Sequence, residues 1–86
     1  MPEVSRFFGI SVRMYFDDHP PPHFHARYGE HKARFAIATG ELLDGDLPAR
    51  AERLVREWAS LHRPELEENF RRCERRVPLT QVEPLP

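Results

Sequence analysis

The stretch DHPPPHFHARYG, residues 18–29, begins with a break between two segments in which apolar and polar side chains alternate. Before it, apolar side chains recur at every second position and predict a half-buried strand over residues 8–16. The prolines at positions 20–22 end that strand, because proline lacks the N–H donor that a central strand needs. The alternation then resumes and predicts a second strand over residues 23–28.

Further strands and then helices are expected after this stretch. A third strand is predicted over residues 32–38 and a short fourth strand over 41–43, each after a turn that contains glycine. Apolar residues then recur every three or four positions and predict helices over residues 48–62 and 64–76. The proline-rich tail, residues 78–86, should run extended along the body and is a candidate edge strand. The sequence therefore predicts an α+β fold, in which an antiparallel meander of three to four strands is packed on one face by two C-terminal helices.

The size and composition of the chain limit its class. With 86 residues it has room for one core, so we expect a single domain over residues 1–86. The single cysteine, Cys73, excludes an intramolecular disulfide and is expected to be a small buried hydrophobe. No apolar segment reaches the roughly 20 residues of a membrane helix, so we expect a cytoplasmic protein with no membrane partner. The net charge of −1 gives no global attraction for nucleic acid. Any attraction for nucleic acid must therefore come from a local cluster of basic side chains.

Polar side chains share one face of the predicted sheet. We expect the helices on the opposite face, because helices cannot bury so many charges. The polar face consists of Ser11, Arg13, Tyr15, His23, His25, Arg27, Lys32 and Arg34. Arginines beside histidines and a tyrosine suit phosphate binding and base stacking, which makes RNA or DNA a candidate ligand. A sheet face that contacts only water is also polar, so the purely structural explanation stays open.

The histidines of this face also make a candidate metal site. Residues two apart on a strand lie about 7 Å apart on one side, so His23 and His25 can converge on one divalent ion. His19 is less well placed, since extended prolines at about 3.1 Å per residue would separate it from His23 by about 12 Å. Zinc or copper would need a third ligand. The candidates for that ligand are His19, Asp17, Asp18 and His31.

Two histidines without such a ligand are compatible with other roles. Acid–base chemistry, contact with nucleic acid and ordinary hydrogen-bonded strand positions are the alternatives for His23 and His25. We expect both to be exposed, so that replacing either by alanine changes stability by no more than about 0.5 kcal/mol. The chain has no Walker loop, dinucleotide fingerprint, nucleophile elbow or paired-cysteine zinc motif. No catalytic residue is therefore assigned, and whether the protein is an enzyme stays open.

A second basic cluster lies near the end of the second predicted helix. It consists of Arg71, Arg72, Arg75 and Arg76. A nucleic-acid patch can have this composition, but the position at the negative end of the helix dipole and the spacing from Glu67 and Glu68 favour a structural explanation. Trp58 lies on the apolar stripe of the first predicted helix and is expected in the core.

Longer segments of the chain carry a family resemblance. They are MPEVSRFFGISVRMYFDDHPPPHFHARYGEHKARF, TGELLDGDLPARA, LVREWASLHRPELEENF and PLTQVEPL, and the signature DHPPPHFHARYG lies within the first of them. Together they resemble the domain-of-unknown-function 4160 family of small prokaryotic proteins over nearly the whole chain. Members are often encoded next to another small protein, and some are described as toxins of type II toxin–antitoxin pairs. The resemblance implies a toxin with a small antitoxin-like protein from an adjacent gene as its partner. The alternatives are a nucleic-acid-binding or regulatory module and a histidine-based metal-binding protein.

Overall fold

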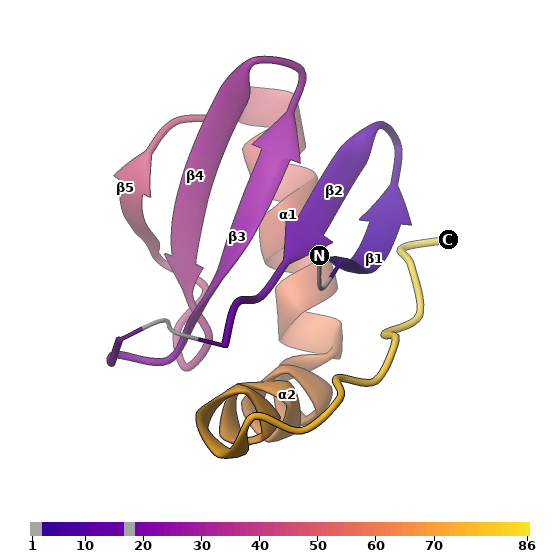
Figure 1. Cartoon of the computed structure of the whole chain (residues 1–86). Helices are drawn as coiled ribbons and strands as arrows, with labels where there is room; N and C mark the ends of the chain where they lie inside the picture. Colours follow the sequence, from indigo (N-terminus) through magenta and orange to yellow (C-terminus); the bar gives the residue numbers. More distant parts are fainter. Residues whose placement is uncertain (1–2, 17–18) are drawn as a thin grey trace.

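Five antiparallel strands form a meander, followed in the chain by two helices (Figure 1). The structure is a computed structural model that describes residues 3–16 and 19–86. Its elements are β1 (Glu3–Phe7), β2 (Ile10–Arg13), β3 (His23–Tyr28), β4 (His31–Ala36), β5 (Leu42–Gly45), α1 (Ala49–Leu61) and α2 (Arg63–Arg75). Strands that follow one another in the chain are neighbours in the sheet. The predicted α+β meander is confirmed, with a five-stranded sheet in place of three to four strands.

The additional strand comes from a hairpin turn within the first predicted strand. Phe8 and Gly9 have positive φ angles of 49° and 80°, which is typical of a two-residue type I′ turn. This turn pairs Phe7 with Ile10, so that β1 precedes β2 in the chain and lies beside it in the sheet. The prediction of one continuous strand over residues 8–16 is therefore wrong at its start. Alternation continued through the turn and concealed it, although Phe8 is 51% exposed and outside the core.

The two helices cover different parts of the sheet. α1 lies behind the sheet in Figure 1, and the ring of its fully buried Trp58 is 5.4 Å from that of Phe7 and 5.7 Å from that of Phe24. α2 lies across the end of the sheet at which β3 begins, and contributes the buried side chains of Phe70 and Cys73 to the core. The burial of Trp58 and Cys73 agrees with the sequence prediction. The face of the sheet opposite α1 remains open over most of its length.

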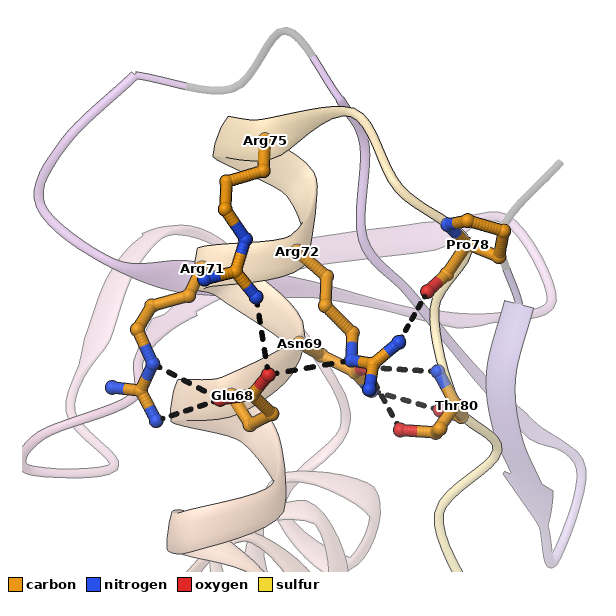
Figure 2. A network of polar contacts seen from close by, with 7 residues as sticks. All are labelled: Glu68, Asn69, Arg71, Arg72, Arg75, Pro78 and Thr80. Carbon is orange, nitrogen blue, oxygen red and sulfur yellow. Dashed lines mark hydrogen bonds and ion pairs between the residues drawn. The ribbon is translucent and has the colours of Figure 1, made fainter.

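The tail after α2 runs extended past β1, as Figure 1 shows in yellow. The backbone N–H of Val82 donates to the carbonyl oxygen of Val4 at 2.8 Å, and the indole N–H of Trp58 donates to that of Glu83 at 2.8 Å. The side chain of the fully buried Asn69 both donates to and accepts from Thr80 (Figure 2). The extended tail is thus confirmed, but residues 77–86, all of which are described, form no strand.

The described chain is closely packed. Its radius of gyration is 11.5 Å, against about 12 Å expected for a compact chain of this length. Within residues 3–16 and 19–86, no helix is long and apolar enough to span a membrane.

Candidate functional site

A pocket of about 170 Å³ opens on the sheet face opposite α1. Its walls come from β2, β3, β4 and β5, together with Tyr15, which follows the end of β2. The polar side chains that line it are Ser11, Arg13, Tyr15, His25, Arg27, Lys32, Arg34 and Asp44. Apart from Asp44 and His23, this set is the polar face that the sequence predicts. The structure therefore brings most of the predicted residues to one concave surface.

Strand register arranges these side chains in rows across the sheet. Arg13 on β2 lies opposite His25 on β3, and His25 lies opposite Arg34 on β4. The neighbouring row of Ser11, Arg27 and Lys32 is paired in the same way. Directly opposed residues on antiparallel strands have Cβ atoms about 4.5–5.5 Å apart. Each row therefore places its basic side chains within reach of one small anion.

The arginines at the two ends of the first row are held by hydrogen bonds. Arg34 donates to both carboxylate oxygens of Asp44, from Nε at 3.0 Å and from Nη2 at 2.7 Å. Arg13 donates from Nε to the hydroxyl of Ser11 at 3.1 Å, and Ser11 in turn donates to Glu3. A guanidinium held in this way loses less rotamer freedom when it binds a ligand. The first row is thus oriented before any ligand arrives.

Two carboxylates near these side chains stay ionised at neutral pH: Asp44, which lines the pocket, and Glu3, which accepts the hydrogen bond of Ser11. The hydrogen bond from Arg34, together with the charges of Arg34 and His25, holds the pKa of Asp44 below its ordinary value of 3.8. The hydrogen bond from Ser11, followed by that from Arg6, lowers the pKa of Glu3 below 4.5. The positive charge of the pocket is therefore partly balanced at its rim, and the cations are held in position by these acids.

His25 lies half-buried beside two other rings. Its ring centroid is 4.7 Å from that of Tyr15 at an interplanar angle of 79°, and 5.2 Å from that of His23 at 65°. Edge-to-face contacts of this kind favour defined ring orientations. The imidazole of His25 and the phenol of Tyr15 both border the pocket. A titratable group and a hydroxyl donor therefore lie side by side among the cations.

His23 is buried, so the expectation that it is exposed is wrong. Only 2% of it is accessible, its ring centroid lies 6.1 Å from that of Phe70, and its Nδ1 donates to the carbonyl oxygen of Pro21 at 2.8 Å. The alternation of apolar and polar residues predicts on which side of a strand a residue lies. It does not predict that α2 covers the start of β3. His23 therefore belongs to the boundary of the core and His25 to the pocket.

Two of the remaining candidate metal ligands, His19 and His31, lie apart from His23 and His25. His19 is exposed in the segment before β3, and His31 lies at the far end of the β3–β4 hairpin, 3.3 Å from the carboxylate of Asp46. Asp17 and Asp18 lie outside the described residues. In the part of the chain that is described, no group of three His, Cys, Asp or Glu side chains is placed to hold a metal ion. Neither His19, His31 nor any other described residue therefore supplies the third ligand that a metal site needs.

Two acids of the site, Glu3 and Asp44, are missing from the sequence prediction. Asp44 could have been found from its charge, because it is opposite in sign to Arg34 and the two flank the predicted turn at Thr39 and Gly40. Glu3 left no such signal, since it lies on the strand that the alternation did not reveal.

Three of the four arginines in the second basic cluster contact a carboxylate of their own helix. Glu68 lies 3.0 Å from Arg71 and 3.4 Å from both Arg72 and Arg75. Figure 2 shows the three arginine side chains around its carboxylate. Arg72 also donates to the carbonyl oxygen of Pro78 at 3.0 Å, which ties the helix to the tail. The hydrogen bond from Arg71, followed by the charges of these arginines, lowers the pKa of Glu68. These contacts support the structural explanation of the cluster.

Comparison with known proteins gives a match to most of the chain. A family model described as "Domain of unknown function (DUF4160)" matches residues 9–71. This range contains every polar side chain of the pocket, whereas β1 and the tail lie outside it. No curated protein and no solved structure matches the chain.

Proposed function

Because the chain belongs to the domain-of-unknown-function 4160 family, we propose that it is the toxin of a type II toxin–antitoxin pair and that it acts by binding single-stranded RNA in the pocket. It acts in the cytoplasm, and a small antitoxin-like protein from an adjacent gene neutralises it. The toxin role rests on the family resemblance. The RNA ligand rests on one structural observation, the two basic rows that cross the open sheet face.

The chemistry of the rows favours RNA over other ligands. Arginine and lysine side chains bind the phosphodiester backbone, and the arginines of the first row are already oriented for it. The rings of Tyr15 and His25 offer stacking surfaces for bases, which are accessible in single strands and not in duplexes. A pocket of about 170 Å³ is suited to one phosphate group, with the flanking nucleotides along the sheet. These features together support a single-stranded ligand.

Binding is tested by fluorescence anisotropy with a labelled single-stranded RNA of mixed sequence. Arg27→Ala and Lys32→Ala should each weaken binding and reduce the slope of log K against log salt by about 0.7, because each removes one phosphate contact. Arg53→Ala is the matched control, since Arg53 is exposed on α1, away from the pocket. If all three variants lose the same affinity, the RNA does not bind the sheet face.

The toxin role has a separate test. Induced expression of the protein should slow bacterial growth, and coexpression of the adjacent gene should restore growth and yield a complex that elutes as one peak in size-exclusion chromatography. Arg27→Ala should relieve the growth defect at an equal protein level. RNA binding without any growth effect would instead favour the alternative of a regulatory nucleic-acid-binding module.

A further inference from the structure

The first basic row contains a titratable group at its centre. His25 lies between Arg13 and Arg34 in the register of three adjacent strands. A phosphodiester bound by the two arginines would therefore lie directly over the imidazole. Histidine is the side chain whose ordinary pKa is nearest to neutral pH, which makes it the most effective proton acceptor at such a position. Phosphate binding alone does not require a histidine at the centre of the row.

A second proton-transfer group borders the same place. Tyr15 follows the end of β2, and its ring meets that of His25 edge to face with the centroids 4.7 Å apart. Transfer of a phosphoryl group within RNA needs a base at the entering oxygen and an acid at the leaving oxygen of one phosphorus. His25 and Tyr15 are near enough to each other for both to reach one phosphate.

We propose that this pocket cleaves single-stranded RNA by internal transesterification, an inference that rests on the proposed RNA binding. The imidazole of His25 accepts the proton of a ribose 2′-hydroxyl, and the 2′ oxygen forms a bond to the adjacent phosphorus. The bond from phosphorus to the 5′ oxygen of the next nucleotide breaks, and the hydroxyl of Tyr15 donates its proton to that oxygen. The products are a 2′,3′-cyclic phosphate and a free 5′-hydroxyl. Water then carries the proton from His25 back to the Tyr15 phenolate.

The arginines have a distinct part in this reaction. Negative charge increases on the phosphate oxygens as the 2′ oxygen attacks, and fixed guanidinium groups stabilise that charge without having to reorganise. Asp44 holds Arg34 through two hydrogen bonds, and Ser11 holds Arg13. Asp44 and Ser11 are thus positioning residues, since they act through the arginines.

The experiment incubates the full chain with a 5′-labelled single-stranded RNA and, in parallel, with its all-deoxy counterpart. We expect fragments that end in a 2′,3′-cyclic phosphate from the RNA, and binding without cleavage for the DNA. His25→Ala should lower the cleavage rate by at least 100-fold and Tyr15→Phe by at least 10-fold, with little change in affinity for the DNA oligonucleotide. Arg53→Ala should cleave like the wild type.

The outcomes separate this inference from the proposed function on which it rests. If both oligonucleotides bind and neither is cut, the cleavage inference is wrong and RNA binding stands. If neither binds, both are wrong. Fragments that carry a 3′-hydroxyl and a 5′-phosphate would also overturn the transesterification, since that chemistry does not use the ribose hydroxyl. Tyr15→Phe keeps the ring contact with His25, so its loss of rate cannot be ascribed to unfolding.

Discussion

His23 and His25 point from the same side of β3, two positions apart, and yet lie in two different regions of the molecule. His23 is covered by Phe70 of α2 and has 2% of its surface exposed. His25 lies half-buried beside Tyr15 in an open pocket between two arginines. Strand periodicity therefore assigns a residue only to a face of the sheet. Whether that face is core or site depends on what the rest of the chain lays over it.

The largest expected effect separates the two histidines by stability. His23→Ala should lower the free energy of unfolding by about 2–4 kcal/mol, because it leaves a cavity beside Phe70 and removes the bond to Pro21. His25→Ala should cost at most about 1 kcal/mol, since its neighbourhood is open to water. Urea unfolding followed by the fluorescence of Trp58, the single tryptophan, measures both. Equal losses would remove the distinction between the two regions.

A smaller effect concerns the rim of the pocket. Asp44→Asn removes a negative charge and weakens the hydrogen bonds that hold Arg34. Single-stranded RNA should then bind about 3- to 10-fold more tightly, because the pocket loses a negative charge that repels the phosphates. If cleavage depends on a fixed Arg34, the rate at saturating RNA should fall in the same variant. Weaker binding, measured by anisotropy, would show that Asp44 positions Arg34 for the ligand itself.

The smallest expected effect is a pH dependence that belongs to the pocket. The lowered pKa of Asp44 means that its carboxylate stabilises the folded state above about pH 4, and that this contribution is lost as the pH falls through the lower pKa of the folded state. The difference in melting temperature between the wild type and Asp44→Asn should therefore shrink between pH 5 and pH 2.5. A core variant without an ionisable group, Val55→Ala, should remain destabilised over the same range, because its loss of packing does not depend on a carboxylate. A constant difference for Asp44→Asn would exclude the ionic contact as its cause.

Much of the fold could be predicted because its signals are local. The β3–β4 hairpin follows from alternation on both sides of Gly29, and the two helices follow from apolar spacing and an opening proline. The hairpin at Phe8 could not be predicted in this way. Its turn contains a bulky residue with positive φ, a position that favours glycine or asparagine.

The basic side chains of the site could be predicted from the sequence, and its two carboxylates could not. Arg13, His25, Arg27 and Arg34 share a face by alternation within each strand, which the sequence displays directly. The contacts of Glu3 and Asp44 depend on the register between strands, which no single strand contains. The burial of His23 depends on a residue 47 positions away, Phe70, and so on tertiary packing.

The hydrogen bonds between the tail and β1 have a consequence for aggregation at this edge of the sheet. β1 is an outermost strand, and the open side of such a strand can recruit strands of other molecules into edge-to-edge aggregates. Val82 and Gln81 each donate a hydrogen bond to β1, to the carbonyl oxygens of Val4 and Glu3 respectively. Three prolines between positions 78 and 86 keep this covering segment from offering a regular edge of its own. The tail thus occupies the β1 edge without extending the sheet. It thereby hinders the pairing of β1 with strands of other molecules.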